Sequence, residues 1–206
     1  MKTEPKYCWY ALKVFYNKAF ELEETLAPRG VETYIPIGRE EVKGEQYLRM
    51  RTAMKQAGQD RLDDPRYIFE NPHIYKRVPL IGSVMFVRCP DTQIKQIRAA
   101  VGERGFVYLK ADGKSPAVIP DREMAAFRLV ADHFHEGMLI LQDEAYTRFR
   151  EGGRVRVKEG PFKGAEGYIK RIRKDRRLLV AIEGVIAVAT SYIPPENLEP
   201  VPEPEA

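Results

Sequence analysis

Few residues in this chain have the types and spacing that chemistry at an active site requires. His133 and His135 lie two residues apart, but no cysteine accompanies them, and the pair alone matches no structural zinc motif. The sequence has no glycine-rich phosphate loop, no Gly-x-Ser-x-Gly motif and no legible Cys–His pairing. We therefore expect no catalytic residue, no metal and no cofactor, and a protein that is not an enzyme.

The cysteines and the apolar runs indicate a cytoplasmic protein. Cys8 and Cys89 lie far apart in sequence, and each falls beside an apolar run, which favours buried free thiols in a reducing compartment. No signal-peptide core precedes the first strand-like run. The longest apolar region, residues 178–189, is interrupted by Glu183 and Gly184 and is too short to span a membrane.

The charge of the chain is unevenly distributed. The net charge of the 206 residues is only +4. Residues 148–177 carry twelve Lys/Arg and four Asp/Glu, a net of +8, whereas residues 178–206 carry five Glu and no Lys or Arg, a net of −5. A basic stripe beside an acidic tail suits contact with a polyanion, and a solvated charged surface explains it equally well.

Hydrophobic periodicity predicts an α+β domain over residues 1–137. Strand-like runs occupy residues 9–15, 31–37, 84–87 and 106–109, and helical spacing follows at about 17–27, 91–100 and from 120 onward. Asn17 and Asp91 are expected as helix caps. The order β-α-β-β-α-β-α is typical of helices packed against a mostly antiparallel sheet.

Residues 38–77 interrupt this pattern and are interpreted as an insertion. The segment is charged, and its apolar positions suggest one amphipathic helix before Pro65 and Pro72 break any continuation. The expected apolar positions are Tyr47, Met50, Met54 and Ala57. A stretch this long inside a compact domain is usually functional or disordered.

The composition changes after Gly137. Residues 142–151 are polar enough for a linker, which we place at 138–150, and residues 151–200 contain short Val- and Ile-rich strands separated by glycine turns. A tight hairpin is expected at Glu183-Gly184. This spacing predicts a small five-stranded, SH3-like β-barrel, and residues 201–206 are expected as an exposed tail.

The most specific local motif lies in residues 153–167. A strand there leads into a turn in which proline fixes one φ angle and glycine can adopt positive φ. The motif residues are Gly160, Pro161, Phe162, Lys163, Gly164 and Gly167. The segment resembles the KOW motif of NusG proteins and of several ribosomal proteins; the alternative is a structural turn of an unrelated barrel.

The N-terminal part resembles the same family. Trp9-Tyr10 and Tyr34-Ile-Pro36 are similar to the start of the NusG N-terminal domain. Pro79-Leu-Ile-Gly-Ser-Val-Met-Phe-Val87 is in register with the family's Pro-Leu-Phe-Pro-Gly-Tyr-Val-Phe-Val, and residues 115–120 resemble the segment before the last helix. Because both domains match in order, the chain is identified as a member of the NusG family.

This resemblance implies a transcription elongation factor that grips the clamp helices of RNA polymerase through an apolar depression. The implied polymerase-contact residues are Lys13, Phe15, Leu80, Ile81, Val84, Phe86, Lys95 and Gln96. Ile81 and Val84 stand where the family has Phe and Tyr, yet each aliphatic group still stabilises a contact by about 1.5–3 kcal/mol when fully covered. Phe86 has the alternative of being a core residue.

Two features point to specialised members of the family. Lys95 and Gln96 fall on a short helix whose polar residues touch the far side of the polymerase cleft in RfaH, and ordinary exposed helix polarity is the alternative. The insertion also resembles those of specialised paralogues. The closest resemblance is to UpxY-type antiterminators, which act on long capsular polysaccharide operons.

The resemblance also implies partners for the second domain. A ribosomal protein or the termination factor Rho would bind the KOW domain, and nucleic acid of the elongation complex could contribute a further contact. The alternative function is a ribosome- or RNA-associated KOW protein that uses the basic stripe. No membrane partner is expected.

Overall fold

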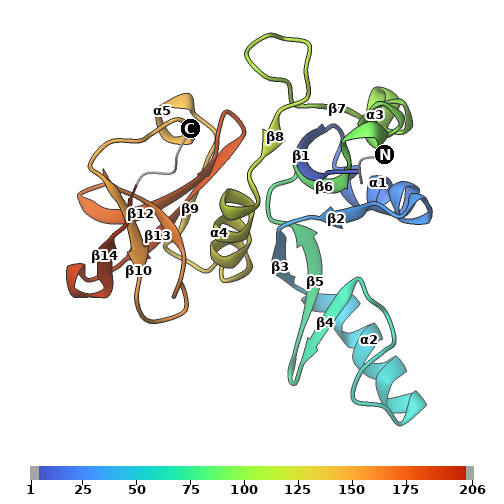
Figure 1. Cartoon of the computed structure of the whole chain (residues 1–206). Coiled ribbons are helices and arrows are strands. Elements are labelled where there is room, and N and C mark those ends of the chain that lie inside the picture. Colours follow the sequence, from blue (N-terminus) through green and yellow to red (C-terminus); the bar gives the residue numbers. More distant parts are fainter. Residues whose placement is uncertain (1–4, 203–206) are drawn as a thin grey trace.

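The computed structural model describes residues 5–202 and contains three antiparallel sheets. Figure 1 shows an N-terminal sheet and a C-terminal sheet on opposite sides of helix α4 (Asp121–Asp132). A smaller sheet extends from the N-terminal sheet (Figure 1). Among the residues described, no helix is long and apolar enough to cross a membrane.

The N-terminal sheet has the strand order β2-β6-β1-β7, and β8 pairs with β1 beyond the end of β7. Its strands are β1 (Tyr7–Val14), β2 (Glu32–Tyr34), β6 (Val84–Pro90), β7 (Gly105–Val107) and β8 (Val118–Ile119). Helices α1 (Ala19–Leu26) and α3 (Ile94–Val101) cover one face, and α4 packs on the other. The predicted α+β domain is thus confirmed outside the insertion, and its elements follow the predicted order except for the short strand β8, which was not predicted.

Strand β1 is buried on both faces, and its side chains alternate between two cores. Tyr10 and Leu12 pack with α1 and α3, whereas Trp9 and Ala11 pack with α4. Cys8 lies directly opposite Cys89 across the β1–β6 pair, and both are buried free thiols as predicted. Burial raises the pKa of Cys89 to about 11, so its thiol stays protonated at neutral pH.

The predicted helix caps were wrong. Helix α1 begins at Ala19, and Asn17 precedes it in the left-handed region with φ 55°. The Asn17 side-chain oxygen instead lies against Gly82, where an added Cβ would come within 2.7 Å of it. Asp91 begins a 3₁₀ turn (Asp91–Gln93) ahead of α3 and makes no capping hydrogen bond from its side chain. Tertiary contact therefore outweighs the local capping preference at Asn17.

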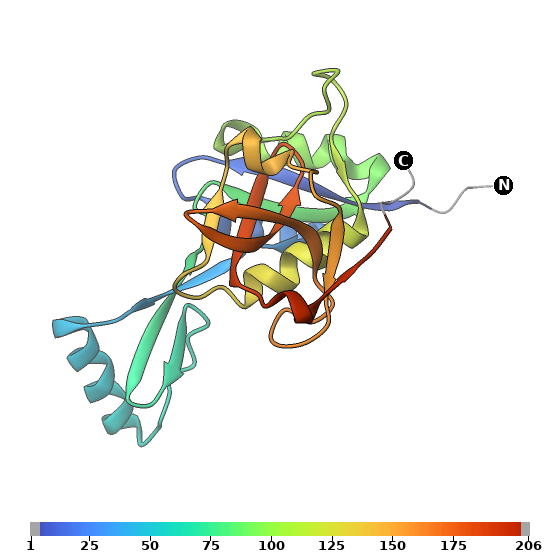
Figure 2. The ribbon, with the colours of Figure 1, turned by 90° about the vertical axis from the view of Figure 1, so that its left-hand side faces the viewer.

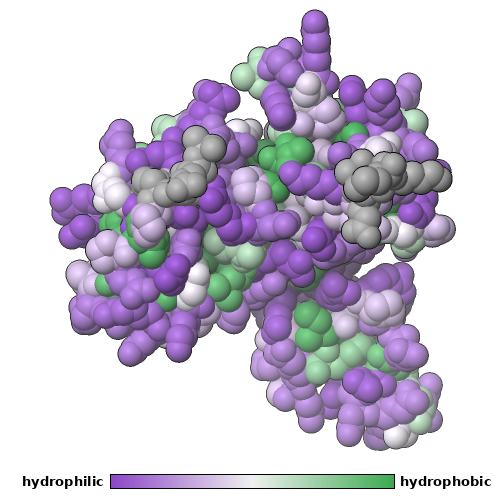
Figure 3. All heavy atoms as spheres, viewed as in Figure 1, coloured by the Kyte–Doolittle hydropathy of each residue, from purple (hydrophilic) through white to green (hydrophobic). Residues whose placement is uncertain are grey.

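The insertion is a folded module with its own core. Its elements are β3 (Ile37–Glu41), α2 (Gly44–Ala57), β4 (Tyr67–Glu70) and β5 (His73–Pro79), with the strand order β3-β5-β4. Val42, Met54 and Ile74 are buried between α2 and the sheet, so the predicted helix is confirmed. Figure 2 shows the module projecting from the body of the molecule, and in Figure 3 apolar residues gather over it.

The C-terminal sheet has six strands in the order β14-β10-β11-β12-β13-β9. They are β9 (Leu139–Leu141), β10 (Arg154–Val157), β11 (Glu166–Ile172), β12 (Asp175–Ile182), β13 (Ile186–Tyr192) and β14 (Leu198–Pro200). The sheet is curved in Figure 2, but its pairing is an open path, so the prediction of five strands closing a barrel is not met.

The sixth strand comes from the segment predicted to be a linker. The apolar run of β9 pairs with the free edge of β13, and α5 (Glu144–Thr147) follows it. Of the predicted linker, residues 139–141 are therefore part of the C-terminal sheet. Of the predicted tail, residues 203–206 lie outside the described residues.

We expect Ile74→Ala to unfold the insertion module locally. The change leaves a cavity in a small core, which costs about 2–5 kcal/mol, whereas Leu48→Ala on the exposed side of α2 costs less than about 0.5 kcal/mol. Native-state hydrogen exchange should show faster exchange in β3, β4 and β5 of the Ile74 variant and unchanged exchange in β1. Equal acceleration in β1 would contradict a separate folding unit.

Candidate functional site

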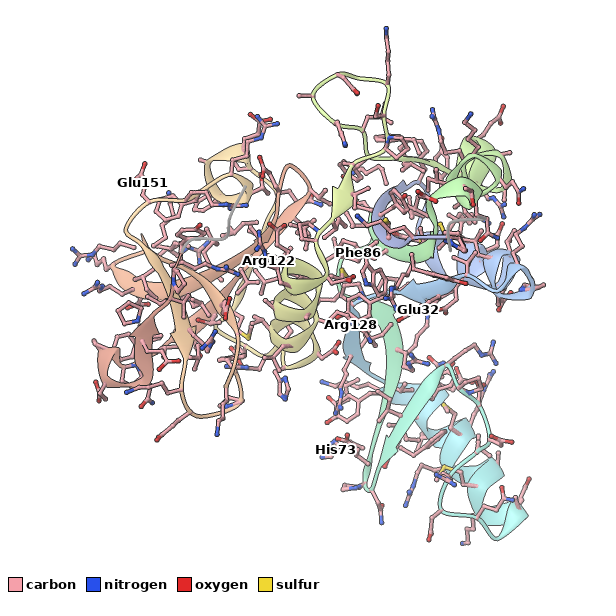
Figure 4. The ribbon with its side chains drawn as sticks, in the orientation of Figure 1. Glu32, His73, Phe86, Arg122, Arg128 and Glu151 are labelled. Atoms are coloured by element: carbon pink, nitrogen blue, oxygen red, sulfur yellow. The ribbon has the colours of Figure 1, made fainter. Side chains whose placement is uncertain are left out.

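Helix α4 joins the two large sheets because it is apolar on two sides. Toward the N-terminal sheet, the Phe127 ring lies 5.3 Å from that of Phe86, and the Tyr34 hydroxyl donates a 2.7 Å hydrogen bond to Asp132. Figure 4 shows Arg128 directed toward Glu32, and their side chains lie 3.4 Å apart. These contacts fix one side of the helix to the sheet.

The polar contacts of α4 are partly shielded from water. The Arg128 guanidinium lies 4.8 Å from the Tyr34 ring centroid and 5.7 Å from that of Trp9, within the range of cation–π attraction. Burial, followed by the hydrogen bond to Asp132, raises the pKa of Tyr34 well above its usual value. The phenol therefore remains a donor to Asp132 at neutral pH.

The opposite side of α4 faces the C-terminal sheet. Glu123 and Ala126 line a narrow cleft together with Tyr168 and Val180 of β11 and β12. One continuous core includes Phe86 and Phe127 on the N-terminal side and Val180 on the C-terminal side. The two large sheets are thus held together by apolar packing across α4.

The turn predicted as a KOW motif takes part in this packing. Gly164 adopts φ 88°, as the sequence predicts, and Gly160 adopts φ 83° in the same turn. Phe162 is 4% exposed, and its ring stacks on His135 at 6.1 Å and meets His133 edge-on at 6.4 Å. In residues 5–202 no group of three or more His, Cys, Asp or Glu side chains is placed to hold a metal ion.

Most of the candidate contact residues gather on or beside the face of the N-terminal sheet that α4 covers. Ile81, Val84 and Phe86 are at most 5% exposed and belong to the core shared with the C-terminal sheet. Leu80 is partly buried against the same core, and Phe15 is 37% exposed. Phe86 is therefore a core residue in this structure, which was the alternative to a contact role.

Lys13 and the α3 pair occupy different faces. Lys13 pairs with both Val84 and Phe106, which places it on the α4 side of β1, and it is partly buried. Lys95 and Gln96 are exposed on α3, which packs on the opposite face of the sheet. The structure therefore does not bring them together with the other six candidates.

A row of aromatic side chains, of which the sequence predicted only Phe15 as a contact residue, extends this face. It consists of Tyr16, Phe15, Phe106 and Tyr108, whose neighbouring ring centroids are 6.2, 5.9 and 5.6 Å apart. Tyr16 is 85% exposed and Phe106 is 49% exposed. The alternation of β7 was the available signal, since Phe106 precedes the buried Val107. The row lacks catalytic groups and can bind a partner through apolar contact.

The segment that follows α4 lies against the buried end of the sheet face that α4 covers. Gln142, just after β9, donates a 3.4 Å hydrogen bond to the Ser83 hydroxyl, and Met138 and Ile140 pack into the shared core. The face is therefore divided into a covered end near Ile81 and an accessible end near Phe15.

Comparison with known proteins places this architecture in a family. The sequence profile of the family described as "Transcription termination factor nusG" matches residues 7–128, which is more than half of the chain. The chain belongs to the NusG family. Members of this family are transcription factors that bind RNA polymerase and are not enzymes.

No curated protein sequence matches the chain. A solved structure titled "Domain interaction in Thermotoga maritima NusG" aligns with 96% of this chain and 98% of its own, with 18% identity and a TM-score of 0.42.

Replacing Glu123 with Gln should stabilise the protein increasingly as pH rises. Burial is the main cause that raises the pKa of Glu123 above 4.5; Arg150 opposes the shift and Glu183 adds to it. Its contribution to stability is therefore present below the unfolded-state pKa and is lost as pH rises through the folded-state pKa. Denaturant titrations of both proteins between about pH 4 and pH 7 check this. A stability difference that does not change with pH would contradict it.

Proposed function

We propose that this NusG-family protein is a transcription elongation and antitermination factor that binds the clamp helices of RNA polymerase and suppresses pausing or termination. The observation that carries the proposal is the accessible end of the α4-side face, where Phe15 is 37% and Phe106 49% exposed beside Lys13. Exposed aromatics that touch one another form an apolar surface suited to a protein partner.

The covered end of the face supports a linked mechanism. Ile81, Val84 and Phe86, which resemble the family's contact positions, lie in the core shared with the C-terminal sheet. Polymerase and the C-terminal sheet would then compete for these side chains, so binding favours a state in which the sheets separate. A ligand shifts such an equilibrium only by its preference for one state.

We further propose a two-domain organisation. Residues 1–137, with the insertion at 38–77, form the polymerase-binding domain, and residues 151–200 form a KOW domain. Residues 138–150 connect the two domains. Separation would expose Phe162, now 4% exposed, to Rho or a ribosomal protein. A tethered domain meets such a partner at high effective concentration once the first domain is bound.

Specialisation for a particular long operon, such as a capsular polysaccharide locus, is the finer part of the proposal. It is supported by the aliphatic residues Ile81 and Val84, by the folded insertion and by the exposure of Lys95 and Gln96. Readthrough should then be greater on a template carrying the protein's own operon leader than on one with an unrelated leader. Equal readthrough on both would indicate a general elongation factor.

Phe15→Ala and Phe106→Ala should each weaken binding to core RNA polymerase by about tenfold to a hundredfold. Each substitution removes a side chain whose burial in an interface stabilises the complex by about 1.5–3 kcal/mol. Both positions are partly exposed in the free protein, so the fold should tolerate the change. Binding is measured by fluorescence anisotropy with labelled protein. Far-UV circular dichroism checks that each variant is folded.

Tyr7→Ala is the matched control, because Tyr7 is a 53% exposed aromatic at the other end of β1. Its affinity should stay within about twofold of the unsubstituted protein. If all three variants bind equally well, the polymerase-binding face lies elsewhere. Charged substitutions of Ile81 or Val84 are unsuitable, because both side chains are buried and the fold itself would be lost.

A further inference from the structure

The hairpin that joins β11 to β12 concentrates positive charge. Residues 170–177 contain six Lys/Arg and a single acid, Asp175. The cations are Lys170, Arg171, Arg173, Lys174, Arg176 and Arg177. None of them belongs to the core that α4 shares with the two large sheets.

Two features of this hairpin cost stability. The two turn residues, Arg173 and Lys174, have φ angles of 50° and 76°, a left-handed conformation that Asn-Gly usually supplies in such turns. Arg171 lies directly opposite Arg176 in the strand pair, and like charges placed so repel each other. Strain of this kind that the fold retains often marks a functional site.

Two of the cations are used by the fold itself. Arg177 donates hydrogen bonds to the carbonyls of Gly137 and Thr190 and lies 3.1 Å from Asp175. The Lys170 ammonium lies 3.6 Å from the centroid of the Phe149 ring. Both side chains are therefore held in place by structural contacts.

The remaining four cations are available to a ligand. Within the part of the chain that the structure describes, Arg171 donates only to the carbonyl of Lys174, at 3.2 Å. Among residues 5–202, no carboxylate lies within ion-pair distance of Arg171, Arg173, Lys174 or Arg176. Asp175, the nearest acid in sequence, is engaged by Arg177.

An aromatic ring lies beside these cations. Tyr192 of β13 is 57% exposed and pairs with Arg177 across the sheet. It lines an open groove of about 550 Å³ together with Ile169, Arg171, Lys174, Arg176 and Asp175, whose carboxylate is engaged by Arg177. Proteins that hold single strands commonly combine a cationic groove with aromatic rings on which bases stack.

We propose that this groove binds single-stranded nucleic acid. Arg171, Lys174 and Arg176 in the groove and Arg173 in the adjacent turn contact backbone phosphates, and Tyr192 stacks with one base. A guanidinium forms paired hydrogen bonds with a phosphate, which suits a ligand of this chemistry. A single strand is favoured over a duplex because only an unpaired base can stack on an exposed ring. The site is separate from the polymerase-binding face and adds a second contact to an elongation complex.

The proposal predicts a definite salt dependence. Neutralising four phosphates of a single strand releases counterions, so the logarithm of the association constant should fall with the logarithm of salt concentration with a slope of about −3. Tyr192→Ala should weaken binding by about tenfold without changing this slope, because stacking releases no counterions.

The test uses the full chain and a fluorescent twelve-nucleotide oligouridine or oligothymidine, titrated at several KCl concentrations. One variant combines Arg171→Gln, Arg173→Gln, Lys174→Gln and Arg176→Gln. The matched control combines Arg39→Gln, Lys43→Gln, Arg49→Gln and Arg66→Gln, which removes the same charge from ion-paired cations of the insertion. The hairpin variant should lose most of its affinity for the oligonucleotide and most of the salt dependence of that affinity. The affinity of the control variant should stay within about threefold of the unsubstituted protein.

Other outcomes overturn the proposal. Equal losses in both variants would mean that only net charge attracts the oligonucleotide. Tighter binding of a duplex of the same length would assign the groove to duplex phosphates, and binding of an oligoglutamate peptide alone would assign it to an acidic protein. Affinity for core RNA polymerase without nucleic acid should be unchanged in the hairpin variant, which separates this proposal from that of the polymerase-binding face.

Discussion

The structure depends on the burial of helix α4 on two sides. Five of its twelve residues are buried: Met124, Ala126, Phe127, Val130 and Ala131. Phe127 packs against Phe86 of the N-terminal sheet, and Ala126 lies in the cleft beside the C-terminal sheet. Because the helix covers apolar side chains of both sheets, neither sheet can move away without exposing apolar area to water. That exposure costs about 25 cal/mol per Å².

This arrangement couples the two ends of the protein. The covered end of the α4-side face and the Phe162 turn are buried in the same core, so what exposes one would expose the other. Phe15 and Phe106 of the aromatic row remain outside that core and can make the first contact with a partner, whereas Tyr108 packs against it. The His133 and His135 rings, which were considered as metal ligands, instead pack against Phe162.

The sequence predicted what local pattern determines. Strand β6, helix α4 after Pro120 and the glycine conformations of the Phe162 turn follow from periodicity and turn chemistry, and all are present. The polar residues from Gln142 onward predict a linker, whereas the short apolar run before them forms β9 because it pairs with the free edge of β13. Phe106 was missed as a surface residue because exposure depends on how far α4 and the C-terminal sheet extend over β1 and β7.

Hydroxyl-radical footprinting of the complex with core RNA polymerase tests the coupling most directly. Met138 is 5% exposed in the shared core, and Met85 is fully buried in the separate core beneath α1 and α3. If polymerase displaces the C-terminal sheet, oxidation of Met138 should rise several-fold on binding while that of Met85 stays unchanged. Binding with no increase at Met138 would contradict the account, because the two sheets would then remain packed across α4.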